Sequence, residues 1–221
     1  HLLTQNELKQ ITSIRKGETK LGECFKTISN LNDIKDVNSQ YVLLGIEEDI
    51  GIRANLGKPG AKDCWQQTLA SICNVQSNPF LKGEDILALG SLRFNELITK
   101  AENADLEELR KLTSLIDQEV SQLIKVIVAS DKTPIVIGGG HNNCYGNLKG
   151  SADALGKPIS ALNIDPHTDY RTPEGRHSGN GFSYAYAERF LKRYFAFGLH
   201  ENYTSSEIFS QFKDNKHLDY N

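Results

Sequence analysis

The chain has 221 residues, a mass of 24.6 kDa and a formal net charge of −3. Hydrophobic residues make up 38% of it and charged residues 24%, a balance that is typical of folded globular proteins and not of disordered ones. This composition argues against binding to nucleic acid or to an anionic membrane surface, and no apolar run is long enough to span a bilayer.

The first 40 residues are polar, and their weak periodicity predicts one short helix near residues 2–14. They do not show the basic and then apolar order of a signal peptide, so we expect a cytoplasmic protein. We interpret residues 1–40 as an N-terminal extension of the domain that follows.

Five short apolar runs then predict buried strands. The first, Tyr41–Ile46, is continuous and ends in acidic and glycine residues. The other four lie at 86–89, 134–137, 159–164 and 194–199.

Helical patterns separate these strands. The strongest is an apolar stripe from Leu106 to Ile127, and further helices are predicted at 61–72, 142–154, 181–193 and 205–212. Alternating strands and helices indicate an α/β fold with a parallel sheet covered on both faces. No linker or repeat divides the chain, so we predict a single domain over residues 1–221.

Two of the predicted strand ends carry polar residues suited to chemistry. Three glycines and His141 follow the strand that ends at Ile137, and Asp165, His167 and Asp169 follow the strand that ends at Ile164. In an extended chain the spacing of two would place these last three side chains on one face. One imidazole among carboxylates favours Mn, Fe or Zn over Ca or Mg.

Each motif has an alternative interpretation when taken alone. The glycines with His141 are also typical of a tight turn or a phosphate-binding loop, and Asp-x-His-x-Asp also occurs at solvated strand ends. Because both motifs end strands of one parallel sheet, where ligands collect at the carboxyl ends, we favour a metal site formed by His141, Asp165, His167 and Asp169.

The combination of GGGHNN (138–143), NIDPHTDYR (163–171) and GRHSGNGF (175–182) resembles the ureohydrolase superfamily, which includes arginase, agmatinase, guanidinobutyrase and formimidoylglutamase. The resemblance runs from about Tyr41 to the end of the chain. It implies the arginase-like fold, a three-layer α/β/α sandwich, and a homo-oligomeric assembly.

The resemblance also implies two Mn²⁺ ions per active site. His141 and Asp169 would hold one ion, His167 the other, and Asp165 would bridge them. Such an enzyme hydrolyses an amidine or guanidino C–N bond with a hydroxide shared by the two ions. Asp169 would accept a hydrogen bond from that hydroxide, and His177 would carry a proton to the leaving amine. A plain loop histidine is the alternative for His177.

One departure from the family pattern concerns the second pair of metal carboxylates. The family takes them from a late Ser-x-Asp-x-Asp strand end, and no such motif occurs within the 221 residues. We therefore expect that the C-terminal third of the family's domain lies outside this sequence.

The substrate is expected to be a small amidine or guanidino compound. Arg53, Arg171 and Arg176 follow predicted strand ends or adjoin His177, and fixed guanidinium groups favour an acidic substrate tail. We include Asn180 with them as a candidate substrate-binding residue. Two sequence segments, GRHSGNGF (175–182) and GLHENY (198–203), look closer to the formimidoylglutamase-like branch than to arginase. This similarity favours hydrolysis of formimidoylglutamate to glutamate and formamide.

Two alternatives remain open. An arginase, agmatinase or guanidino-acid hydrolase would release urea in place of formamide. A non-catalytic binding module with the arginase fold would lack the second carboxylate pair and would bind no Mn²⁺.

Overall fold

The computed structural model describes residues 1–221 and contains six strands in two three-stranded sheets. The strand orders are β2-β1-β3 and β4-β5-β6, and every pairing is parallel. The strands are β1 (Tyr41–Glu47), β2 (Ile86–Arg93), β3 (Thr133–Ile137), β4 (Ile159–Ile164), β5 (Leu191–Phe197) and β6 (Leu218–Tyr220).

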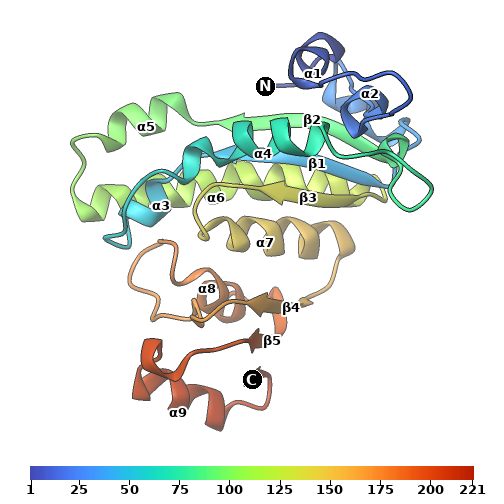
Figure 1. Cartoon of the computed structure of the whole chain (residues 1–221). Helices are drawn as coiled ribbons and strands as arrows, with labels where there is room; N and C mark the ends of the chain where they lie inside the picture. The colour runs from blue at the N-terminus through green and yellow to red at the C-terminus, as the bar shows by residue number, and fades with distance from the viewer. The chain divides into compact units, whose positions relative to one another are not determined.

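Nine α-helices accompany the strands (Figure 1). They are α1 (Gln5–Ile11), α2 (Leu21–Cys24), α3 (Ile50–Arg53), α4 (Cys64–Cys73), α5 (Asn95–Ala101), α6 (Leu106–Ala129), α7 (Asn143–Leu155), α8 (Gly181–Ala187) and α9 (Ser206–Asp214). None of these helices combines the length and the apolar character needed to cross a membrane.

The chain divides into two compact units. The first comprises residues 1–49, 59–98 and 126–139, and the second comprises residues 50–58, 99–125 and 140–221.

The first unit is built around β1, which lies between β2 and β3. Five consecutive residues of β1, from Val42 to Ile46, are buried, as expected for a central strand. Trp65 of α4 packs closely on this strand, because a Cβ added at Gly45 would lie 2.3 Å from its ring. The unit's core is therefore assembled from β1 and the helices packed on it.

The second unit has β5 as its central strand and an aromatic core. Tyr170, Phe182, Tyr194 and Phe212 are buried together, and the rings of Phe182 and Tyr194 stack with centroids 4.3 Å apart. Close packing of α6 on α7 depends on small residues, since a Cβ at Gly150 would lie 2.4 Å from the carbonyl oxygen of Ser121. This unit contains all the residues of the candidate site.

The predicted alternation of helices with parallel strands is confirmed, but the strands form two sheets and not one. Periodicity identifies a buried strand without indicating its partner. β4 hydrogen-bonds to β5 alone, and Leu162 and Ile164 on β4 are 61% and 76% exposed.

Several element boundaries also differ from the predictions, and β2 and β5 both extend beyond their predicted ranges. The helix predicted over 181–193 ends at Ala187, because Arg189 takes a left-handed conformation with φ of +67° that an α-helix cannot continue. The N-terminal helix is shorter than predicted and begins at Gln5 behind a capping box formed by Thr4 and Glu7. The short strand β6 was not predicted.

Candidate metal centre and its supporting loop

Three side chains meet beyond the carboxyl end of β4. His141 lies just before α7, and Asp165 and Asp169 follow Ile164, the last residue of β4. Nδ1 of His141 lies 2.5 Å from Oδ2 of Asp169 and 3.8 Å from Oδ2 of Asp165. One ligand atom from each of the three residues lies within 4.8 Å of the others. An imidazole and two carboxylates at this spacing are a donor set that suits a divalent transition-metal ion such as Mn²⁺.

The electrostatics of this group favour a positive charge. Burial lowers the pKa of His141, but the hydrogen bond to Asp169 and the charges of Asp169 and Asp165 outweigh it, so that the pKa is raised above its usual value. The two carboxylates thus stabilise the protonated form of the His141 imidazole.

His167 lies beside the three-residue group and not within it. Its backbone N–H and its Nδ1 lie 2.8 Å and 3.0 Å from Oδ1 of Asp165, whereas His141 faces Oδ2 of the same carboxylate. The ring of His167 is stacked on Tyr203, with centroids 5.1 Å apart. The expected shared face of Asp165, His167 and Asp169 requires extended chain, but β4 ends at Ile164 and the chain bends after it.

The backbone is strained at Asp169, where φ is +43°. This left-handed region is unfavourable for residues other than glycine, and strain of this kind is common at functional sites. The flanking residues hold it in place: Tyr194 donates a 2.6 Å hydrogen bond to the carbonyl oxygen of Thr168, and Tyr170 stacks on Tyr194 in the core. The aromatic core of the second unit therefore fixes the direction of Asp169.

The glycines before His141 form the predicted turn. Gly138 and Gly139 both have positive φ, at +77° and +75°. A side chain at either position would be strained, so the sequence requires glycine there.

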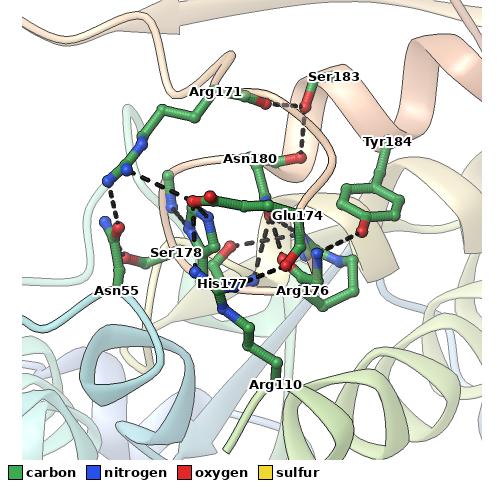
Figure 2. Close-up of polar contacts among 12 residues, drawn as sticks. Asn55, Arg110, Arg171, Glu174, Arg176, His177, Ser178, Asn180, Ser183 and Tyr184 are labelled. Atoms are coloured by element: carbon green, nitrogen blue, oxygen red, sulfur yellow. Dashed lines mark hydrogen bonds and ion pairs between the residues drawn. The ribbon is translucent and has the colours of Figure 1, made fainter. Parts of the chain in front are cut away.

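Residues 171–180, which we call the arginine loop, follow the carboxylates and carry four of the predicted site residues (Figure 2). Ser178 donates to the carbonyl oxygen of Gly51 at 2.9 Å, and Arg171 donates from its backbone to Gly179 at 3.0 Å. The loop is therefore closed on itself and anchored to α3.

Glu174 is the acidic centre of the arginine loop. Its Oε1 atom lies 3.3 Å from Arg110, 3.4 Å from Arg171 and 3.2 Å from Nε2 of His177 (Figure 2). The Glu174 carboxylate thus links α6 to Arg171 and His177 of the arginine loop.

His177 is fully buried, and both of its ring nitrogens are engaged. Nδ1 accepts from the backbone N–H of Gly179 at 3.1 Å, which leaves Nε2 as the atom that donates to Glu174. Burial, followed by the charge of Arg171, lowers the pKa of His177 to about 4. The imidazole is therefore neutral at pH 7, and both interpretations of His177, a proton carrier and a loop histidine, stay predictions.

Arg176 and Asn180 are both buried and bonded to each other. Arg176 forms an ion pair with Asp117 of α6, with Nε 2.7 Å from Oδ2. The amide oxygen of Asn180 accepts from Arg176 and from the backbone of His177, and its nitrogen donates to Gly175 at 2.8 Å. Both side chains are thus bonded within the chain, and the substrate-binding role predicted for Arg176 and Asn180 stays a prediction.

The other two predicted substrate-binding residues differ in accessibility. Arg171 is 54% exposed, and its guanidinium donates to Asn55 at 2.7 Å as well as to Glu174. Arg53 at the end of α3 is only partly exposed and donates to the carbonyl oxygen of Ala101. Arg171 is the better placed of the two to meet an acidic group.

The Arginase family model matches residues 40–219, which is most of the chain. The chain belongs to the arginase family. The sequence-based assignment to the ureohydrolase superfamily is confirmed by this match.

Curated relatives of this arginase-family chain include formimidoylglutamases. The protein from Geobacillus sp. (strain WCH70) is 28% identical over 159 residues, covering 69% of this chain and 44% of the relative. The protein from Streptococcus gordonii is 26% identical over 189 residues, covering 81% and 52% respectively. The chain thus spans about half the length of the curated relatives it matches.

Solved structures confirm the predicted arginase-like α/β fold. Trypanosoma cruzi formiminoglutamase, solved with Mn²⁺, superposes with a TM-score of 0.67 at 22% identity, covering 92% of this chain and 65% of that one. Formimidoylglutamase from Bacillus subtilis gives a TM-score of 0.68 at 13% identity, covering 95% and 61%. Identities this low establish the fold alone.

Asp117 and Glu174, the acidic partners of Arg176 and His177, were not among the residues predicted from the sequence. A signal for Asp117 is present in α6, where Thr113, Asp117 and Ser121 recur every four residues and are all buried. Such a polar stripe beside an apolar one indicates that the helix faces a polar partner. No comparable signal marks Glu174, which lies in an irregular loop.

Proposed function

We propose that this arginase-family chain acts as a manganese-dependent hydrolase that cleaves the C–N bond of a linear amidine. The preferred substrate is formimidoylglutamate, which takes up water to give glutamate and formamide. The observation that carries the proposal is the group formed by His141, Asp165 and Asp169, whose ligand atoms lie within 4.8 Å of one another.

His141, Asp169 and Asp165 would hold one Mn²⁺ ion, and His167 would serve a second ion that shares Asp165. The donor chemistry fits, because imidazole nitrogen and carboxylate oxygen both bind Mn²⁺. Bound Mn²⁺ would supply a water of lowered pKa as the nucleophile at neutral pH.

The chain's own residues would then orient the substrate and move protons. We assign Asp169 the acceptance of a hydrogen bond from the nucleophilic water, since its carboxylate belongs to the three-residue group. The proton transfer predicted for His177 stays a prediction, and it requires the contact between Nε2 and Glu174 to open.

Arg171 is our candidate for recognition of the glutamate tail. Its exposed guanidinium is held in place by Asn55 and Glu174, and a fixed guanidinium binds a carboxylate through paired hydrogen bonds. The formimidoylglutamase relatives support the same substrate. The predicted homo-oligomer and cytoplasmic location stay predictions.

The products test this proposal directly. We would incubate the chain and Mn²⁺ separately with formimidoylglutamate, arginine and agmatine, and measure formamide and urea. We expect formamide and glutamate from the first substrate only. The Asp169→Asn variant should be inactive, whereas Asp153→Asn, at an exposed residue of α7 paired with Lys149, should be as active as the unsubstituted chain. Urea from arginine or agmatine would favour the alternative hydrolases.

The assignment of Arg171 is tested by kinetics. Arg171→Lys keeps the charge but loses the paired donors, so it should raise KM more than it lowers kcat. Arg193→Lys, at an exposed position of β5, is the matched control. An unchanged KM in Arg171→Lys would show that Arg171 does not recognise the substrate.

A further inference from the structure

Arg176 has the features of a residue that fixes other residues in place. Its side chain is only 6% exposed, and that of its partner Asp117 is 3% exposed. A guanidinium has five N–H donors and no acceptor, so a buried one needs five acceptors to be satisfied.

All five donors of Arg176 have acceptors. Nε donates to Oδ2 of Asp117 at 2.7 Å, and Nη2 donates to Oδ1 of Asp117 at 3.3 Å and to the carbonyl oxygen of Asn142 at 3.0 Å. Nη1 donates to the carbonyl oxygen of His177 at 3.2 Å and to the amide oxygen of Asn180. The guanidinium therefore has no donor left for a substrate.

Two aromatic rings hold the guanidinium as well. The central carbon of Arg176 lies 4.8 Å from the ring centre of Tyr145 and 5.1 Å from that of Tyr184. The Tyr184 hydroxyl in turn accepts from the backbone N–H of Gly175 at 2.9 Å (Figure 2). These contacts restrict the guanidinium to one position and orientation.

The acceptors of Arg176 come from three segments of the chain. Asp117 belongs to α6, Asn142 precedes α7, and His177 and Asn180 belong to the arginine loop. Two of these segments adjoin the candidate metal centre: Asn142 directly follows His141, and the arginine loop begins two residues after Asp169. Arg176 thus bonds to both the segment that carries His141 and the segment that continues from Asp169.

We propose that Arg176 is a positioning residue, which ties the arginine loop to the turn before α7 and thereby sets the spacing between His141 and Asp169. Asp117 supplies the fixed point on α6. The part of this inference that concerns Mn²⁺ rests on the proposed function, whereas the tie between the two segments does not.

Lysine cannot replace Arg176 in this role. An ammonium carries three donors on one nitrogen and can keep the charge interaction with Asp117, but it cannot reach acceptors on three segments at once. Arg176→Lys should therefore fold while releasing either the arginine loop or the carbonyl of Asn142.

The experiment compares the chain with Arg176→Lys and with the exposed control Arg193→Lys. Amide hydrogen exchange is measured without metal at the backbone N–H groups of Arg171, Ser178, Gly179 and Cys144. Mn²⁺ binding is then measured by titration calorimetry, at a temperature at which every variant is folded. In Arg176→Lys we expect at least tenfold faster exchange at these amides and a 10- to 100-fold weaker Kd for Mn²⁺, the range typical when a residue behind a metal ligand is replaced. Arg193→Lys should change neither.

Unchanged exchange in Arg176→Lys would overturn the inference, and so would faster exchange with an unchanged Kd. A chain that binds no Mn²⁺ would refute the proposed function, while the exchange data would still decide whether Arg176 ties the two segments together. If Arg176→Lys fails to fold, Asn180→Ser decides, since it removes the amide that bonds to Arg176, His177 and Gly175 and leaves the pair of Arg176 with Asp117 intact. It should weaken Mn²⁺ binding in the same direction, and an unchanged Kd would overturn the inference.

Discussion

Two neighbouring parts of the second unit differ in how their polar side chains are partnered. In the candidate metal centre, His141, Asp165 and Asp169 turn ligand atoms toward one another and Asp169 has a strained backbone. In the arginine loop, Arg176 and Asn180 are buried and bonded to acceptors and donors of the chain. A carboxylate cluster needs a cation to be stable, whereas a satisfied ion pair needs nothing further. The first part is therefore a candidate for binding a metal ion, whereas the second part supports the loop.

The largest effect is expected from removing the charge of Asp117. Asp117→Asn leaves the Arg176 guanidinium buried without its counter-charge, which should lower the free energy of unfolding by about 3–5 kcal/mol. Urea unfolding followed by circular dichroism measures this loss.

The matched control for Asp117→Asn lies on the same helix. Glu107 forms an exposed pair with Lys111 at 2.8 Å, and Glu107→Gln should cost less than about 0.5 kcal/mol. Similar losses in the two variants would mean that the Arg176 network does not stabilise the fold.

The next effect concerns the pH dependence that His177 confers. Its pKa in the folded chain is about 4, against 6.5 for an unperturbed histidine, so the unfolded chain binds an extra proton between these values. His177 therefore destabilises the fold progressively as pH falls from 6.5 to 4, by up to about 3 kcal/mol.

A His177→Asn variant isolates this contribution. The stability of the unsubstituted chain minus that of the variant should be constant above pH 7 and should decrease as the pH falls toward 4. A difference that does not change with pH would show that His177 is not held neutral by burial.

The smallest effect concerns backbone strain at a position outside the candidate site, for comparison with the strained Asp169. Arg189 is exposed and has φ of +67°, and it lies outside the candidate site. Arg189→Gly should raise the free energy of unfolding by about 0.5–1 kcal/mol, because glycine adopts this conformation without steric cost. Chemical denaturation measures the gain, and a loss of stability would indicate that the Arg189 side chain makes a contribution of its own.

The sequence was sufficient to predict the α/β class and the proximity of His141, Asp165 and Asp169. Apolar runs locate strands, and polar residues directly after Ile137 and Ile164 had to lie at strand ends. The sequence could not predict how the strands pair, since a burial pattern does not indicate which strand lies beside a given one.

The contacts of the arginine loop could not be predicted, for a different reason. Arg176 lies next to His177 in a loop, so its charge suggested a ligand-binding role. Its actual partner Asp117 is 59 residues away on α6, and only the folded chain brings the two together. The sequence of a loop does not indicate which distant segments of the chain will bury its side chains.

Titration of the chain with Mn²⁺ tests the central claim most directly. The account predicts saturable binding of at least one Mn²⁺ per chain, and binding weakened by more than about 100-fold in His141→Ala, since loss of a direct ligand should exceed the effect of residues behind it. Asp153→Asn should bind as the unsubstituted chain does. No binding at millimolar Mn²⁺, or equal binding by His141→Ala, would contradict the assignment of His141, Asp165 and Asp169 as a metal site.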